Sequence, residues 1–106
     1  LNFDFLDSDY EPVADQFRLY PNVPNPFNPA TALRYDLPQD EFVTITIYDM
    51  LGNIVRNLVH EYQSLGHKSV QWNATNNFGK SVSAGVYLYT IVAGDISKTQ
   101  KMILLK

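Results

Sequence analysis

The sequence predicts an all-β protein, an immunoglobulin-like antiparallel β-sandwich of about seven strands. Short runs of alternating apolar and polar residues return about every 8–14 residues, with turn residues between them. No stretch keeps the 3.6-residue period of an amphipathic helix. Seven tyrosines and six phenylalanines among 106 residues also favour strands. A chain of this length suits one domain with its own core.

The first part of the chain differs from the rest in charge. The net charge is −3. Every charged side chain in residues 1–15 is acidic, namely Asp4, Asp7, Asp9, Glu11 and Asp15. We expect 1–15 to be an acidic linker or the end of an upstream domain, and 16–106 to form the sandwich. Because the sequence starts on Leu1 without a signal peptide, we expect a fragment whose export signal lies upstream.

Alternation predicts the strands in order. A first short strand holds Phe17 and Leu19, and the others are expected at 31–37, 42–48, 54–60, 68–73, 86–92 and 96–105. The period of two assigns an inward-facing set: Leu33, Tyr35, Leu37, Val43, Ile45, Ile47, Val70, Trp72, Tyr87, Tyr89 and Ile91. Val55 and Leu58 are expected to anchor the strand at 54–60, with some irregularity between them. Thr44 and Thr46 are expected to point outward. Turns are predicted at Gly52, at 64–66 and at Gly94.

The segment 21–29, PNVPNPFNP, is predicted to be a rigid extended loop. Four of its residues are prolines and three are asparagines. Proline lacks the amide hydrogen that a ladder needs and interrupts helices, and asparagine favours turns. The segment is therefore expected to lie outside the regular strands.

Composition excludes several classes of protein. Cysteine is absent, so the chain has no disulfide framework and no thiolate metal site. No apolar run approaches the roughly 20 residues that a membrane-spanning helix needs. Basic residues are scattered, apart from Lys98, Lys101 and Lys106 near the end, whereas nucleic-acid binding uses a clustered basic face. We expect no nucleic-acid partner and no membrane-spanning segment.

No combination of residues in the sequence indicates a catalytic site. None of the serines sits in a nucleophile elbow. His60 and His67 fall on different predicted strands and have no acidic cluster beside them to complete a metal site, so surface positions are expected for both. Trp72, Tyr87 and Tyr89 suggest a sugar-stacking platform, but their register with core residues favours packing. We expect no catalytic residue and no cofactor.

The residues of one loop fit two interpretations, a metal site and a turn. Asn73, Thr75 and Asn77, followed by Gly79, faintly resemble the oxygen ligands of a calcium loop. All three side chains are neutral, and calcium affinity rises with ligand charge. The competing interpretation is an asparagine-rich turn whose side chains cap backbone groups.

Three ordered motifs resemble a known family. The first, at 19–38, is LYPNVPNPFNPATALRYDLP, with the core Asn25, Pro26, Phe27, Asn28 and Pro29. The second is ITIYDMLGNIV at 45–55, and the third runs from Trp72 to the closing KMILLK at 101–106. Over about residues 17–106 the chain resembles the type A C-terminal sorting domains of the type IX (Por) secretion system. It is also similar to the Ig-like domain of flagellar hook-capping proteins.

Two departures from the family pattern are visible. Pro21 stands where the family often has a glutamine. The loop after Trp72 is rich in amides, whereas the corresponding loop of relatives is often acidic. The second departure weakens any metal role that the resemblance would transfer to this loop.

The resemblance implies a non-catalytic address label at the C-terminal end of an exported protein. Its implied partners are the secretion machinery of the outer membrane, a sortase-like peptidase and the upstream domain of the same polypeptide. The implied location is outside the cell or on its surface, reached through the periplasm. We also expect a monomer.

The residues expected to be recognised lie at the end of the chain: Lys98, Lys101, Met102, Ile103, Leu104, Leu105 and Lys106. The lysines would form a cationic edge, and the four apolar residues would grip the core. Edge lysines that deter aggregation explain the same pattern without any receptor. The alternative function is a structural or carbohydrate-associated accessory Ig-like domain of a secreted polysaccharide-degrading enzyme or surface protein.

Overall fold

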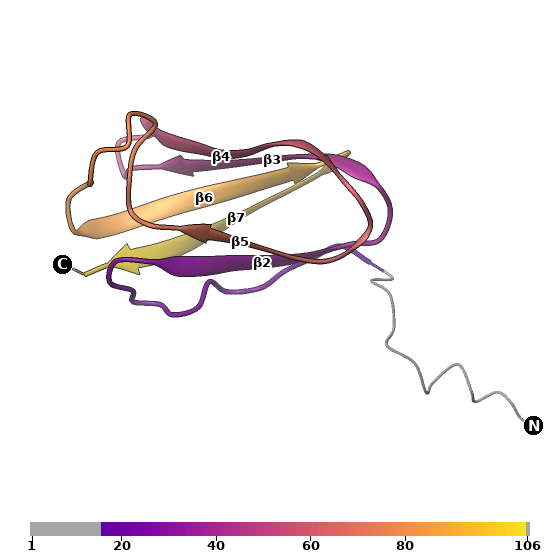
Figure 1. The fold of residues 1–106 in the computed structure, drawn as a ribbon, viewed down its shortest axis with the longest axis horizontal. Coiled ribbons are helices and arrows are strands. Elements are labelled where there is room, and N and C mark those ends of the chain that lie inside the picture. The colour runs from indigo at the N-terminus through magenta and orange to yellow at the C-terminus, as the bar shows by residue number, and fades with distance from the viewer. Residues whose placement is uncertain (1–15, 106) are drawn as a thin grey trace, which may run out of the picture.

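The computed structural model describes residues 16–105, so the predicted linker 1–15 and Lys106 lie outside it. Two antiparallel sheets face each other as two layers (Figure 1). The smaller sheet has the strand order β1-β2-β5 and the larger sheet has the order β4-β3-β6-β7. The strands are β1 (Arg18–Leu19), β2 (Thr31–Leu37), β3 (Glu41–Tyr48), β4 (Ile54–Gln63), β5 (Gly66–Trp72), β6 (Gly85–Ala93) and β7 (Ile96–Leu104). The predicted Ig-like sandwich of seven strands is confirmed.

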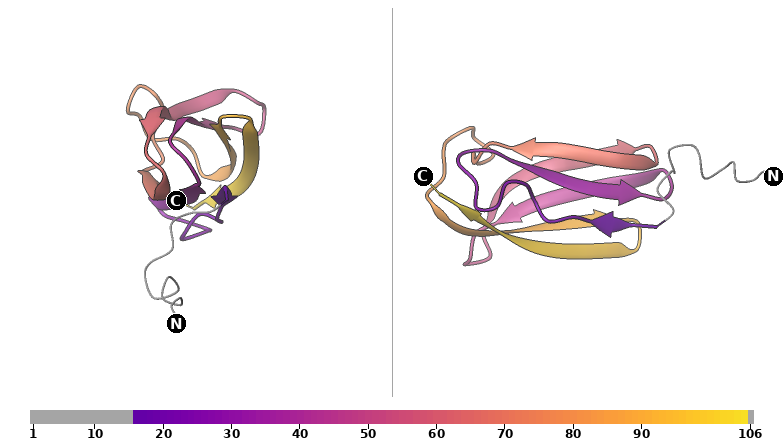
Figure 2. Two further views of the ribbon diagram at one scale, coloured as in Figure 1. Left: turned by 90° about the vertical axis from the view of Figure 1, so that its right-hand side faces the viewer. Right: turned by 90° about the horizontal axis from the view of Figure 1, so that it is seen from below.

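Two edge strands lie on the same side of the sandwich. β1 ends the smaller sheet and β7 ends the larger one. They run along each other in the view from below (Figure 2). β7 is paired along its whole length with β6, from Gly85↔Leu104 to Ala93↔Ile96. β1 pairs with β2 through two residues only, Arg18 and Leu19.

The core lies between the two sheets and contains most of the predicted inward-facing residues. The largest buried side chains are Trp72, Tyr35, Tyr89, Phe27, Leu33, Leu37, Ile45, Ile47, Ile91, Met102, Leu104 and Val43. The Trp72 indole N–H donates to the Thr75 carbonyl at 2.9 Å, and the Tyr87 hydroxyl donates to the Ser83 carbonyl at 2.5 Å. The expected packing of Trp72, Tyr87 and Tyr89 in the core is therefore confirmed.

The predicted anchors of β4, Val55 and Leu58, pack against the core but are only partly buried, and the strand is irregular as expected. β4 has two irregularities opposite β3, where the pairing passes from Ile45↔Val59 to Thr46↔Asn57 and later skips Val55. Leu58 and Val55 are the extra residues at these bulges, so they contact the core but stay half-exposed. Val59, directly opposite Ile45, is the residue of β4 that is buried. A strict period of two cannot anticipate the change of face that a bulge produces.

Thr44 and Thr46 alternate with buried residues on β3, as predicted, but Thr46 is only 7% exposed. β3 is a central strand, with Asn57 of β4 and Thr90 of β6 paired on either side of Thr46. These neighbours cover the outer face at this point, so the expected exposure of Thr46 is wrong. Thr44 is more accessible, and its hydroxyl lies 3.3 Å from the Nδ1 atom of His60.

A carboxylate organises the turn between β3 and β4. One oxygen of Asp49 accepts hydrogen bonds from the amides of Leu51 and Asn53, each at 2.9 Å. The bond from Asn53 is the main reason that the pKa of Asp49 lies below its ordinary value. Gly52 has a φ of 88°, a left-handed conformation that suits glycine. The Tyr-Asp and Leu-Gly pairs of the second motif are thus the residues of a specific turn.

Substituting one core residue tests the register of β3. Ile45→Asp would place an unpaired charge between the sheets, which costs several kcal/mol, out of a typical total of about 5–15 kcal/mol. We expect its melting temperature to fall by more than about 15 °C, or the domain not to fold. Thr44→Asp, beside His60, is the matched control and should melt within a few degrees of the parent. Equal melting temperatures for the two variants would contradict the assigned register.

Candidate functional site

The proline-rich loop 21–29 passes along the end of β7 and pairs with it. Phe27 forms a parallel bridge with Leu104. The Phe27 amide donates to the Ile103 carbonyl at 3.0 Å, and the Phe27 carbonyl accepts from the Leu105 amide at 2.8 Å. The side-chain oxygen of Asn25 accepts from the Ile103 amide at 3.0 Å. We call this arrangement the clamp: Asn25 and Phe27 from the loop, and residues 103–105 from the end of the chain.

The clamp is anchored in the core by one aromatic side chain. Phe27 is 1% exposed, and its ring centroid lies 5.8 Å from that of Trp72. Trp72 in turn meets Tyr87 edge-to-face at 5.5 Å. Of the five predicted signature residues, only Phe27 is buried, while Asn25, Pro26, Asn28 and Pro29 are exposed. The loop lies outside the regular strands, as predicted, but it also supplies a core residue.

The rest of the loop is tied to the start of β2. The Asn22 amide group donates to the Thr31 hydroxyl at 3.0 Å, and the Thr31 hydroxyl donates to the Pro24 carbonyl at 2.8 Å. Val23 bridges Ala32 through two backbone bonds, of 2.8 and 3.0 Å. Thr31, which follows the signature loop, is therefore buried, and its hydrogen bonds fix the loop against β2.

The predicted recognition residues divide into two sets. Met102 and Leu104 are buried and grip the core, as expected. Ile103 is half-buried and Leu105 is 51% exposed, so the expectation that all four apolar residues grip the core is wrong. The reason is the alternation of β7, which turns every second side chain away from the other sheet. The remaining residues are exposed or outside the described part: Lys98 and Lys101 are exposed, and Lys106 is not described.

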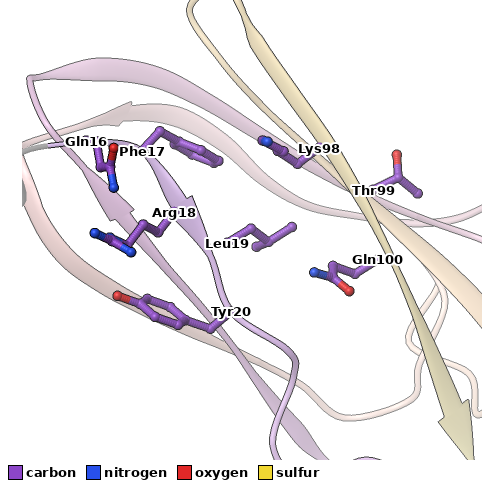
Figure 3. A pocket seen from close by; sticks show the side chains of 8 residues that line it. All are labelled: Gln16, Phe17, Arg18, Leu19, Tyr20, Lys98, Thr99 and Gln100. Atoms are coloured by element: carbon purple, nitrogen blue, oxygen red, sulfur yellow. The ribbon is translucent and has the colours of Figure 1, made fainter.

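A slot of about 460 Å³ separates β1 from β7. Figure 3 shows Phe17 and Leu19 turned toward β7, with Lys98 and Gln100 on the facing side. Arg18 and Tyr20 point away from β7 in the same view. The slot therefore has an apolar side on β1 and a polar, cationic side on β7.

A hydrogen-bonded cluster links the residue that follows β1 to β2 and β5. The Tyr20 hydroxyl donates to one carboxylate oxygen of Asp36, and the Nδ1 atom of His67 lies 2.6 Å from the other. The side chain of Asp36 is 5% exposed and that of His67 is 53% exposed. Sequence reasoning did not propose this cluster. The pairing of β2 with β5, which sets Asp36 opposite His67, brings the two together.

The cluster perturbs its own ionisable groups. Desolvation favours the neutral form of Asp36, but the hydrogen bonds from Tyr20 and His67 outweigh it and hold the pKa of Asp36 below its ordinary value. The same bond to the carboxylate raises the pKa of Tyr20. The Tyr89 hydroxyl donates to the Tyr20 carbonyl at 3.2 Å, and burial raises the pKa of Tyr89 to about 12. The start of the proline-rich loop is thus fixed to both sheets.

The candidate calcium ligands already accept or donate hydrogen bonds within the protein. The Thr75 hydroxyl donates to the side-chain oxygen of Asn73 at 2.6 Å and accepts from the Arg56 guanidinium at 2.9 Å. Asn77 instead pairs with Asn57, through bonds of 2.8 and 2.9 Å. A guanidinium in this position repels a cation, so the contacts favour the turn interpretation. Residues 16–105 contain no group of three or more His, Asp or Glu side chains placed to hold a metal.

The two histidines lie on different sheets, His60 on β4 and His67 on β5. His60 contacts Thr44 and meets Phe42 edge-to-face at 4.8 Å on the outer face of the larger sheet. His67 is oriented by Asp36 on β5 of the smaller sheet. Between Gln16 and Leu105 there is also no helix of the length and apolar character needed to cross a membrane.

Fold and sequence together define the class as an Ig-like domain. The FlgD Ig-like domain matches residues 28–96, and this chain belongs to that family. No curated protein sequence matches the chain. The expected similarity to the Ig-like domain of hook-capping proteins is therefore confirmed at the level of the family.

Two solved structures from Porphyromonas gingivalis share the fold. Dimeric latent PorU aligns with a TM-score of 0.69 and 22% identity, over 92% of this chain and 10% of that chain. PorZ, described as an essential bacterial surface component of the type-IX secretion system, aligns with a TM-score of 0.57 and 20% identity, over 83% of this chain and 11% of that chain. At these identities the likeness shows the fold alone. The chain spans about a tenth of the length of each.

The Asp36 cluster predicts a specific dependence of stability on pH. Because the folded-state pKa of Asp36 is depressed, its carboxylate adds stability that is complete above the ordinary aspartate pKa and is lost as the pH falls through the folded value. We expect the melting temperature of Asp36→Asn to fall less than that of the parent between about pH 5 and pH 2. Asp95→Asn, at an exposed turn, should keep the parental slope. Parallel profiles for Asp36→Asn and the parent would contradict this assignment.

Proposed function

We propose that this chain is a non-catalytic module that directs a larger secreted protein through the type IX secretion pathway to the cell surface or the medium. The clamp is the observation that carries the proposal. Two motifs mark the resemblance to sorting domains, the proline-rich loop and the closing strand, and the loop pairs with residues 103–105 of the latter. A signature loop that holds the last strand in place explains why both motifs occur together.

The geometry of β7 suits recognition by a partner. Its buried residues Met102 and Leu104 fix the strand, while Lys98, Lys101 and Leu105 stay accessible. The strand is thus held rigidly with its charged side chains free, which reduces the entropy that a receptor must remove on binding. Membership of the FlgD Ig-like family and the likeness to PorZ, a secretion-system component, agree with this role.

The proposal places the module outside the cytoplasm and gives it no catalytic task. Its partners are the outer-membrane secretion machinery, a sortase-like peptidase and the upstream domain of the same polypeptide. The carbohydrate-associated alternative loses its candidate platform, because Trp72, Tyr87 and Tyr89 are buried. The sorting role is therefore the function that the described residues support best.

Secretion of a fused reporter tests the proposal. A periplasmic reporter carrying residues 1–106 at its C-terminus should reach the surface or the medium of a bacterium that has this secretion system. Reversing the two exposed charges of β7, Lys98→Glu with Lys101→Glu, should retain most of the reporter in the periplasm. Lys80→Glu, an exposed lysine in the β5–β6 loop, is the matched control and should be secreted normally. Retention of the unmodified fusion, or equal secretion of all variants, would refute the sorting role.

A further inference from the structure

A second cavity lies on the smaller sheet, beside Tyr20. It has a volume of about 450 Å³ and is lined by Tyr20, Arg34, Asp36, His67, Lys68 and Ser69. Pockets that hold small ligands usually measure roughly 300–1,000 Å³. Tyr20 points away from β7 (Figure 3), and no residue of β7 lines this cavity. The cavity is therefore separate from the strand on which the proposed function depends.

Arg34 presents an oriented cation to this cavity. Its guanidinium carbon lies 5.4 Å from the centroid of the Tyr20 ring. A guanidinium that stacks on an aromatic ring keeps the edges of its planar fork available for an acceptor. The ring is itself fixed, because the Tyr20 hydroxyl donates to Asp36. The Arg34 side chain is exposed and forms no ion pair with any residue from 16 to 105.

The other side chains around the cavity favour a negatively charged ligand. Lys68 adds a second positive charge, and its ammonium group donates to the Ser64 hydroxyl at 3.0 Å. Ser69 is paired with Arg34 across β2 and β5, so its hydroxyl lies next to the guanidinium in the register. Asp36 is acidic, but its side chain is 5% exposed and both of its oxygens are already hydrogen-bonded. Arg34 and Lys68 therefore determine the charge that a ligand meets.

Two features of the cavity select a carboxylate among the possible anions. A guanidinium binds carboxylate and phosphate equally well in geometry, through two parallel hydrogen bonds. Asp36 remains a negative charge at one side, and its repulsion is about twice as large for a doubly charged phosphate as for a carboxylate. The Tyr20 ring, on which a sugar would stack, is already covered on one face by Arg34. The carboxylate of a peptide satisfies both restrictions.

We propose that this cavity binds the side-chain carboxylate of an acidic peptide segment of a partner protein. The Arg34 guanidinium donates two hydrogen bonds to the carboxylate, and the Ser69 hydroxyl donates a third. Lys68 attracts the same group from the edge of the cavity. Tyr20 acts as a positioning residue, because its ring holds the guanidinium in place. A partner bound here leaves the lysines of β7 free for the proposed sorting role.

Titration of the full chain, 1–106, with two short peptides tests this proposal. A Gly-Asp-Gly tripeptide blocked at both ends carries one carboxylate, and blocked Gly-Asn-Gly is its neutral match. At constant ionic strength the first should shift the Ser69 amide resonance saturably, with millimolar affinity, and the second should not. Arg34→Gln should weaken binding at least about tenfold, because it removes two charge-assisted hydrogen bonds. Arg34→Lys keeps the charge without the fork and should still weaken binding about threefold or more.

Arg18→Gln is the matched control, because Arg18 is an exposed arginine of the same sheet that does not line the cavity. It should change the affinity by less than about twofold. The melting temperature of each variant reports whether it remains folded.

Three outcomes would overturn the proposal. One is the absence of a saturable shift with the Asp tripeptide. Another is an equal loss of affinity in Arg18→Gln and Arg34→Gln, which reduces the effect to the general charge of the sheet. The third is tighter binding of inorganic phosphate or glucuronate than of the tripeptide, which assigns the cavity to a different anion. None of these readouts involves secretion, so the inference stands or falls separately from the proposed function.

Discussion

The backbone pairing of Phe27 with Leu104 is the contact on which the arrangement of this domain depends. Without it, the last strand would be held on one side only, by β6. The loop that supplies Phe27 contains four prolines and therefore cannot form a long ladder. It has one short stretch at which an amide and a carbonyl both face β7, and the Phe27 side chain fixes that stretch to the core beside Trp72.

The smaller sheet needs further contacts to hold β1, because this strand is so short. Two paired residues supply few ladder bonds, and a strand of this length is marginal by itself. The cluster of Tyr20, Asp36 and His67 adds side-chain bonds that join the chain directly after β1 to β2 and β5. The Tyr89 hydroxyl then connects the same point to the larger sheet. The first strand and the start of the proline-rich loop are thus held by polar contacts, in contrast to the apolar packing of the other strands.

The sequence was sufficient to predict the strands and most of the core. Alternation identified Val43, Ile45 and Ile47 correctly, since β3 pairs on both sides and must bury one face. It did not single out Val59, the buried residue of β4, because the bulge at Leu58 changes the face of the strand. It also could not show that Thr46, on a central strand, would be covered by its neighbours.

The sequence predicted the two segments that form the candidate site but did not predict that they contact each other. The loop 21–29 and the closing strand were both identified from composition and resemblance. Their contact joins Asn25 to Ile103, residues far apart in sequence, and a single chain contains no local signal for such a pairing. The pair of Asp36 and His67 was missed for the same reason, because only the register of β2 against β5 sets them opposite each other.

The exchange rate of one amide tests the clamp most directly. Asn25→Ala removes the acceptor of the Ile103 amide and leaves the backbone bonds of Phe27 in place. A net hydrogen bond of about 1 kcal/mol corresponds to roughly fivefold faster exchange of Ile103. The Leu105 amide should be unaffected. Asn28→Ala, which removes an exposed asparagine of the same loop, should change neither amide. Unchanged exchange of Ile103 in Asn25→Ala, or the same acceleration in Asn28→Ala, would contradict the clamp.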